Sequence, residues 1–406
     1  MRNAFSRSQN HLGLKGLIAF ITVTNMFIPL STDLYLPALP GMAGHFSASA
    51  AQVNMTLTAF FFFFAVGILL FGPFSDKYGR KPLLIFGIAL YTLAGFLCAL
   101  SDTINALILW RVFQALGAGC VIAVSMAVVK DCFYGKVRET ILAVIQAMSM
   151  IAPMVAPVVG AFILKFASWH EMFYLLGALG AISLVASFFF QETLRISGRY
   201  KGSILHSLGR LRVVAKNPAF SSLLLVFSLL TAPYMAFIAL SSYIYIDQFR
   251  LSEQAYSAFF AANGVFSILG PVLYLKISGK VSAKRLAESC FIISLLCGAA
   301  LFVFGSFSEW VFFFIFAPFT LIASGIRPFS TGLLLIQQDR DTGSASSLIN
   351  SVNTFCGSLG MMLASVGWGN MVTGLSVILT VSVLLSLAGW FLLSRAKLCV
   401  KGLSFE

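Results

Sequence analysis

Long apolar runs are the feature that most constrains the fold of this chain. Twelve of them follow one another along its 406 residues, and each is close to the roughly 20 residues that a helix needs to cross a bilayer. Six runs precede residue 191 and six follow residue 217, at approximately 14–39, 53–71, 83–100, 104–129, 140–164, 172–190, 219–246, 255–275, 287–307, 310–336, 345–366 and 371–393. The pattern predicts an all-α membrane protein of twelve transmembrane helices in two six-helix bundles, with no separate soluble domain.

The composition also indicates a membrane location. Only 10% of the residues are charged and 59% are hydrophobic, whereas a soluble domain carries about 25% charged residues. The formal net charge of +13 is compatible with nucleic-acid binding. However, cytoplasmic loops of membrane proteins also collect Lys and Arg. We therefore expect the lipid bilayer, and no nucleic acid, to be the partner of this basic chain.

The positions of the basic residues test the helix count. If the N-terminus is cytoplasmic and the helices alternate in direction, nearly all of the 27 Lys and Arg residues fall in cytoplasmic segments. The exceptions are Lys165 and Arg250 in outside loops, and Arg111 and Arg327 inside helices. One missed helix would invert every later loop and destroy this asymmetry. We therefore predict that both termini are cytoplasmic.

The longest interruption separates the sixth run from the seventh. Residues 191–217 carry six Lys and Arg residues, which is typical of a cytoplasmic segment. We predict an N-terminal six-helix bundle over 1–190, a basic cytoplasmic linker over 191–217 and a C-terminal six-helix bundle over 218–406.

Polar amides inside the runs follow a period of three helices. Helices 3, 6, 9 and 12 contain no Asn, Gln, Asp, Glu, Lys or Arg in their interiors, apart from Glu288 at the start of helix 9. The amides fall in helices 1, 2, 4, 5, 8 and 11, as Asn25, Asn54, Gln114, Gln146, Asn263, Asn350 and Asn353. Because polar groups avoid lipid, we expect every third helix to face lipid. The others would surround a wet central cavity, in three-helix repeats with pseudo-twofold symmetry.

Motifs of several other protein classes are missing from the sequence. There is no P-loop, so no ATP hydrolysis is expected. The seven cysteines and four histidines form no CxxC motif and no Cys/His cluster, so we expect no metal, no cofactor and cysteines that serve as packing residues. A membrane-bound enzyme would need catalytic or metal-binding residues clustered at one depth, and the histidines are scattered over termini and loops.

Residues 72–83, which follow helix 2 on the predicted cytoplasmic side, form the most specific motif. They read Gly-Pro-Phe-Ser-Asp-Lys-Tyr-Gly-Arg-Lys-Pro-Leu. This segment resembles the signature loop G-x-x-x-D-x-x-G-R-[KR] of the major facilitator superfamily, which implies that family's fold and transport by alternating access. The matching positions are Gly72, Asp76, Gly79, Arg80 and Lys81. We expect the two glycines to allow a tight turn and a close approach of helices.

We expect this motif to act as a cytoplasmic latch that closes in the outward-open state. Arg80 can pair with Asp131 at the end of helix 4. Asp76 can cap a helix N-terminus, and the resemblance implies that this is helix 11, near Gly343 and Ser344. An ordinary basic loop is the alternative. A second copy, at 270–271, ends helix 8 without an acid and should latch less.

Five further segments resemble the bicyclomycin-resistance (Bcr/CflA-type) drug:proton antiporters within that superfamily. They are 31–40 at the end of helix 1, 109–117 in helix 4, 128–131 after it, 152–160 in helix 5 and 343–348 at the start of helix 11. In helix 5, the positions of the antiporter packing motif are Pro153, Ala156, Pro157 and Gly160. Ala156 stands where the family usually has Gly. The resemblance implies export of small amphipathic antimicrobials across the bacterial inner membrane in exchange for protons.

Asp33 and Arg111 are the two formal charges inside the N-terminal bundle. Counting 1.5 Å per helical residue, both lie roughly 10 Å from the outer ends of their helices, so they can meet. Burial disfavours a charged carboxylate and a nearby cation favours it. Movement of water or substrate near the pair can therefore switch the proton on Asp33. We predict a proton-coupling pair; the alternatives are a static ion pair and a capping role for Asp33.

Other residues are candidates for the wall of the substrate cavity. Gln114 follows Arg111 by three residues and so shares its face of helix 4. Arg327, in helix 10, either attracts an electronegative substrate group or extends toward the cytoplasm. The remaining candidates are Asn25, Tyr35, Gln146, Tyr234, Tyr243, Asn263, Asn350 and Asn353. For the run Phe60–Phe64 we expect mostly lipid contact and packing.

These patterns predict a monomeric secondary transporter that exports antimicrobials in exchange for protons. The helix interiors contain one acid, Asp33, and two bases, Arg111 and Arg327. We therefore expect neutral, zwitterionic or weakly anionic substrates to be preferred over dications. The closest alternative is a proton-coupled exporter of a metabolite, such as an amino acid, sugar or nucleoside, on the same fold. A non-transporting sensor is a further alternative, which the intact motifs disfavour.

Overall fold

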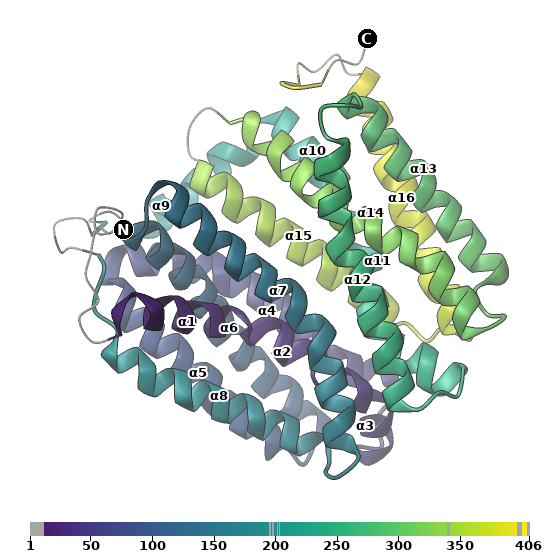
Figure 1. Ribbon diagram of the computed structural model, residues 1–406, viewed down its shortest axis with the longest axis horizontal. Helices are drawn as coiled ribbons and strands as arrows, with labels where there is room; N and C mark the ends of the chain where they lie inside the picture. Colours follow the sequence, from purple (N-terminus) through teal and green to yellow (C-terminus); the bar gives the residue numbers. More distant parts are fainter. Residues whose placement is uncertain are drawn as a thin grey trace. The chain divides into compact units, whose positions relative to one another are not determined.

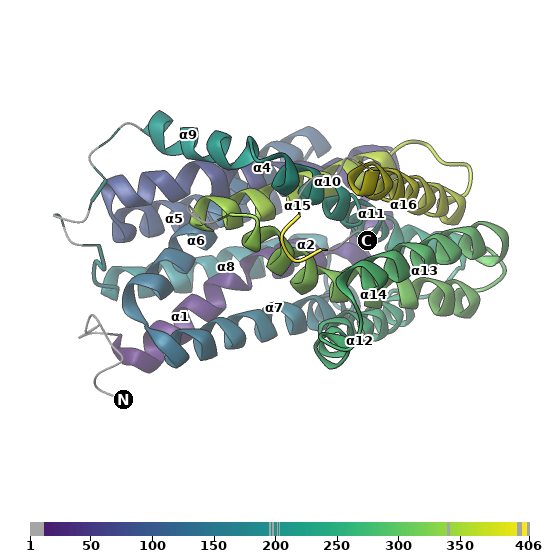
Figure 2. The same ribbon diagram turned by 90° about the horizontal axis from the view of Figure 1, so that it is seen from above.

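The computed structural model describes residues 12–194, 196, 199–200, 202, 204–338, 342–395 and 400–403, and its regular elements there are all helices (Figures 1 and 2). In chain order they are α1 (Gly13–Asn25), α2 (Phe27–Asp33), η2 (Leu36–Ala38), α3 (Leu39–His45), α4 (Ala50–Tyr78), α5 (Arg80–Ala99), α6 (Ile104–Cys132), α7 (Gly135–Leu164), α8 (Trp169–Phe189), α9 (Ile204–Ala215), α10 (Pro218–Ser228), α11 (Thr231–Ser242), η4 (Tyr243–Gln248), α12 (Glu253–Ile277), α13 (Ala283–Phe304), α14 (Glu309–Ile336), α15 (Thr342–Ala364) and α16 (Met371–Arg395).

Eleven helical segments in the described ranges are long and apolar enough to cross a membrane. The first of them joins α1, α2, η2 and α3, and the seventh joins α10, α11 and η4. The twelfth predicted span is α15, whose 23 residues are sufficient in length. Its many Ser and Asn side chains lower its hydropathy. The predicted all-α membrane fold of twelve helices is confirmed.

Two of the twelve helices are interrupted at matching positions, which we did not predict. Pro29 is the third residue of α2 and Pro233 is the third residue of α11. Proline lacks the N–H that would bond to the carbonyl four residues earlier, and its ring clashes with that carbonyl. The preceding helices therefore end at Asn25 and Ser228. Discontinuous helices of this kind commonly form substrate and ion sites in transporters.

The chain divides into two compact units. The N-terminal unit holds α1, α2, η2, α5 to α8 and the part of α4 that follows Thr58, while the C-terminal unit holds α10 to α16. The short segments Leu39–Ala43 and Ser49–Thr58 belong to the C-terminal unit by their contacts. The predicted linker contains one helix, α9. The predicted boundaries at residues 190 and 218 remain a proposal.

Close contacts made by small residues recur in both units. In the N-terminal unit they join α4 to α6, α5 to α8 and α2 to α7, through Gly67 and Gly119, Gly95 and Gly177, and Leu34 and Gly160. In the C-terminal unit they join α12 to α14, α13 to α16 and α11 to α15, through Gly270 and Gly325, Gly298 and Thr380, and Ala232 and Gly360. Each unit thus repeats one packing scheme, because small residues let helix backbones approach closely without a hydrophobic driving force.

These contacts predict opposite effects for two glycines of the same helix. A Cβ on Gly325 would lie 2.8 Å from the carbonyl oxygen of Gly270, whereas a Cβ on exposed Gly332 would meet nothing within 4 Å. Gly325→Ala should destabilise the protein by about 1–3 kcal/mol, the usual cost of overpacking. Gly332→Ala should be neutral or stabilising by up to about 1 kcal/mol. Thermal unfolding of the two purified variants in detergent would check this, and equal melting temperatures would contradict it.

Candidate functional site

Arg111 is fully buried inside the N-terminal unit, on α6. Its guanidinium carbon lies 4.2 Å from the ring centre of Phe60, 5.0 Å from that of Tyr35 and 5.8 Å from that of Phe173. Its Nη1 donates a hydrogen bond of 2.7 Å to Oε1 of Gln114. Because a cation within about 6 Å of an aromatic face is attracted to the ring, three rings from three segments hold this charge.

Asp33, the last residue of α2, is also buried. Its Oδ1 accepts a hydrogen bond of 3.0 Å from the hydroxyl of Thr32. Although both residues are described, no ion pair joins Asp33 to Arg111 in this structure. The link between them is Tyr35, which follows Asp33 by two residues and contacts the guanidinium. The static ion pair is therefore not the arrangement seen, and the coupling role of the two residues remains a prediction.

The α7 motif lies directly against the segment that carries Asp33. A Cβ on Gly160 would overlap the carbonyl oxygen of Leu34, the residue after Asp33. Ala156 and Pro157 are buried on the same helix, and Pro153 is half-buried. On its other side α2 is held by Ser31, whose hydroxyl lies 2.7 Å from the hydroxyl of Tyr91 on α5. The segment that carries Asp33 is thus held by contacts with two helices, α7 and α5.

The other two candidates in the N-terminal unit lie in different environments. Asn25, at the end of α1, is buried, and its Nδ2 donates to the carbonyl of Ile21 at 2.7 Å. Gln146 is exposed on α7. The assignment of both residues to a cavity wall remains a prediction.

The candidate residues of the C-terminal unit lie on five different elements, which are α11, η4, α12, α14 and α15. Tyr234 on α11 is close enough to Arg327 on α14 to interact with it electrostatically, and Arg327 keeps an exposed surface. Tyr243 and Asn263 are buried. On α15, Asn350 is exposed and Asn353 is half-buried. The structure thus brings Arg327 toward Tyr234, whereas the other candidates lie on η4, α12 and α15.

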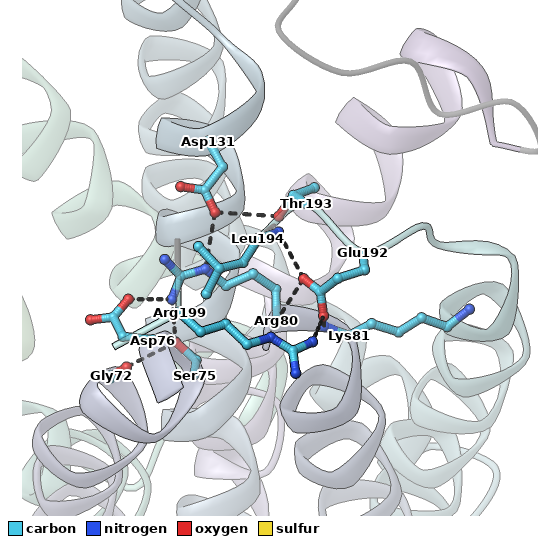
Figure 3. A network of polar contacts seen from close by, with 10 residues as sticks. All are labelled: Gly72, Ser75, Asp76, Arg80, Lys81, Asp131, Glu192, Thr193, Leu194 and Arg199. Atoms are coloured by element: carbon cyan, nitrogen blue, oxygen red, sulfur yellow. Dashed lines mark hydrogen bonds and ion pairs between the residues drawn. The ribbon is translucent and has the colours of Figure 1, made fainter. Parts of the chain in front are cut away.

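The junction between α4 and α5 forms a dense polar network (Figure 3). The buried Arg80 bonds through Nη1 to Asp76 and Ser75, each at 2.6 Å, and through Nε to Asp131 at 3.0 Å. The ion pair of Arg80 with Asp131 is the one that the sequence suggests. Asp76 is half-exposed, at 53% of its side chain, and capping of α15 by this residue remains a prediction.

Glu192, in the predicted linker, completes this network and was missed by sequence reasoning. Its Oε1 accepts from the backbone N–H of Arg80 at 3.0 Å, and its Oε2 accepts from that of Lys81 at 3.1 Å (Figure 3). These are the first two N–H groups of α5, which have no partner inside the helix. In place of a local side chain, a carboxylate from another segment caps the helix and complements its dipole.

A reciprocal contact closes the other side of the junction. The ammonium group of Lys81 donates to the carbonyl of Phe188, at the end of α8, at 2.8 Å. Arg199 lies 3.9 Å from Glu192, and the N–H of Tyr200 donates to the carbonyl of Asp76 at 2.9 Å. Glu192, Arg199 and Tyr200 therefore lie against the motif, and we call these three residues the strap. The sequence feature that could have indicated this cap is Glu192 itself, because it is an acid at the start of an otherwise basic segment.

The two glycines of the motif behave differently from each other. Gly79 has a φ of +108°, and a Cβ there would lie 2.5 Å from Oε2 of Glu192, so glycine is required. Gly72 instead lies inside α4, which continues to Tyr78, and nothing lies within 4 Å of its Cβ position. The expectation that Gly72 forms a turn or a close contact was wrong, because the helix does not end there.

The fold and this site together define a multi-helix membrane transporter. The chain matches the Major Facilitator Superfamily over residues 21–365, and it belongs to that family. It is 26% identical to a bicyclomycin resistance protein homolog of Haemophilus influenzae over 93% of this chain and 96% of that protein. It is 28% identical to the multidrug transporter MdfA of Yersinia pestis over 84% of this chain and 85% of that protein. The crystal structure of the nucleoside transporter NupG shares the fold, with a TM-score of 0.73 and 14% identity over 94% of this chain and all of NupG.

The Glu192 cap predicts a measurable loss of stability. Glu192→Ala leaves two N–H groups of α5 without their acceptor and should cost about 1 kcal/mol, as for other lost N-caps. Glu192→Gln keeps one acceptor oxygen and should lose less. Thermal unfolding in detergent measures both. Exposed Glu139 on α7 provides the control, since Glu139→Gln removes the same charge without a lost cap. A melting temperature of Glu192→Ala equal to that of this control would contradict the capping role.

The contact between Gly160 and Leu34 predicts a loss of activity. Gly160→Ala must displace the α2 segment beside Asp33, at a typical overpacking cost of about 1–3 kcal/mol. We expect the initial rate of transport into everted vesicles to fall severalfold at equal protein level. Exposed Val159 is the matched position, and Val159→Ala should transport normally. Equal rates for the two variants would show that the contact is unimportant for transport.

Proposed function

We propose that this chain exports small amphipathic antimicrobials from bacteria in exchange for protons. Its relatives include proteins described as a bicyclomycin resistance protein homolog and as a multidrug transporter, which supports drug export. The observation that carries the coupling mechanism is the buried carboxylate of Asp33 at a helix break. A charge placed in hydrocarbon costs at least about 2.5–3.5 kcal/mol, so an acid at this position favours a functional role.

In the proposed cycle, Asp33 takes up a proton when its end of the cavity is open to the acidic outside. Substrate or water entering beside Tyr35 and Arg111 changes the surroundings of the carboxylate and releases that proton to the cytoplasm. The two bundles, 1–190 and 218–406, rock about the central site. Both termini lie in the cytoplasm of a bacterial inner-membrane protein that acts as a monomer.

The network around Arg80 is the proposed cytoplasmic latch. Arg80, Asp76, Asp131 and the strap that contains Glu192 hold α4, α5 and α6 together at one end of the N-terminal unit. In this proposal Asp76 also caps α15 in the outward-open state, so the latch forms and breaks once in each cycle.

The substrate preference follows from the charges near the proposed cavity. Arg111 is held by aromatic rings and Arg327 is exposed near Tyr234. With Asp33 protonated, both remaining charges are positive. Like charges repel by several kcal/mol at close range in a low-dielectric site. We therefore propose neutral, zwitterionic or weakly anionic substrates and poor export of dications.

The test combines a substrate panel with Asp33→Asn in proteoliposomes. A neutral phenicol, an anionic sulphonamide and a dicationic dye are supplied in turn, and substrate-driven proton release is recorded. We expect release with the first two and little with the dye, and none for any substrate with Asp33→Asn. Asp102→Asn, in the exposed α5–α6 loop, is the control and should keep full release. Wild-type coupling in Asp33→Asn would disprove the role of Asp33, and export of the dye alone would disprove the charge preference.

A further inference from the structure

A small cavity lies within the C-terminal unit, between η4 and the loop that joins α15 to α16. Its volume is about 250 Å³, slightly below the usual range of ligand pockets, so it suits a small organic group. The residues that line it are Tyr243, Asp247, Gln248, Trp368, Gly369, Asn370 and Met371. Of these, only Tyr243 was a candidate for the substrate cavity.

The π-helical form of η4 brings three of these side chains to one wall. The N–H of Phe249 donates to the carbonyl of Ile244 at 2.9 Å, five residues earlier instead of four. In this wider turn, the residues four and five positions after a given residue lie on the same side of the helix as that residue. For Tyr243 these residues are Asp247 and Gln248. In an ordinary α-helix, Gln248 would point well away from Tyr243. Single π-helical turns are rare and frequently occur at functional sites.

The opposite wall carries an aromatic ring in a fixed position. Nε1 of Trp368 donates to the carbonyl of Leu363 at 3.0 Å. The indole lies so close to Gly374, near the start of α16, that any Cβ at that position would overlap the ring. The ring is therefore oriented before any ligand arrives, which lowers the entropic cost of binding.

Asn370 connects the two walls. Its Oδ1 accepts from Nε2 of Gln248 at 3.3 Å and from the N–H of Thr373 at 3.0 Å. Its Nδ2 donates to the hydroxyl of Ser306, in the loop between α13 and α14, at 3.1 Å. Three separate segments thus meet at this one amide, which is itself part of the cavity lining.

The charge of the cavity favours a cationic ligand. Asp247 is the only charged residue among those that line it, and its carboxylate is exposed. We propose that this cavity binds a monovalent organic cation, whose ammonium group lies beside Asp247 and against the rings of Trp368 and Tyr243. Aromatic rings recognise alkylammonium groups, and a nearby carboxylate adds an opposite charge that attracts the cation. Binding here does not depend on the direction of transport or on the proposed coupling by Asp33.

A nearby base provides a test with the opposite sign. Arg250 interacts electrostatically with Asp247 and does not line the cavity. It competes with a bound cation for the carboxylate. Arg250→Gln should therefore tighten binding, whereas Asp247→Asn should weaken it.

The experiment is equilibrium dialysis of labelled benzyltrimethylammonium against the purified full-length protein in detergent. We expect saturable binding that is about fivefold weaker in Asp247→Asn and in Trp368→Leu, as for the loss of one carboxylate or one ring at a partly exposed site. Glu253→Gln is the charge-matched control, since Glu253 begins α12 and does not line the cavity; it should bind like the wild type. Melting temperatures establish that each variant is folded.

Three outcomes would overturn the proposal. They are no saturable binding by the wild type, equal losses in Asp247→Asn and Glu253→Gln, and displacement of the label by neutral benzyl alcohol as effectively as by unlabelled cation. Tighter binding by Arg250→Gln together with weaker binding by Asp247→Asn would support it.

Discussion

The buried guanidinium of Arg111 is the interaction on which the N-terminal unit depends. A permanent charge inside a membrane helix is costly, and here it is compensated by rings and an amide. The rings come from α4, from α8 and from the residue that follows α2, and the amide comes from α6. Since each ring belongs to a different segment, loss of any one would leave the charge less compensated and loosen the packing of the unit.

This arrangement needs the break in the first membrane helix. Pro29 starts the break, and the chain after α2 then turns so that Tyr35 faces Arg111 while Asp33 stays buried two residues earlier. Gly160 fixes the position of that turn by contact with the carbonyl of Leu34. A carboxylate, a cation and the α7 motif therefore share one short segment. A movement of α7 would therefore displace the segment of Asp33, the residue that we propose carries the proton.

The helices could be predicted from the sequence because each must supply a long apolar run to cross lipid. The ion pair of Arg80 and Asp131 was also predicted correctly. It could be predicted because the signature loop gives the position of Arg80, and Asp131 lies at the end of the fourth membrane helix. The contact of Phe60 with Arg111 was not predicted, because a run of five phenylalanines does not indicate which ring faces a buried cation. Glu192 was missed because charge counting along loops sums basic residues and ignores which single acid can reach a helix N-terminus. Contacts of this kind depend on tertiary geometry that periodicity does not encode.

We propose that protons drive transport by this chain. The most direct test of this proposal uses proteoliposomes with a neutral phenicol on one side and an imposed pH gradient, with the membrane potential clamped to zero. With proton-driven export, the phenicol accumulates in the acidic compartment, and accumulation stops when a protonophore collapses the gradient. Equal phenicol distribution with and without the gradient, at normal rates of exchange, would contradict it.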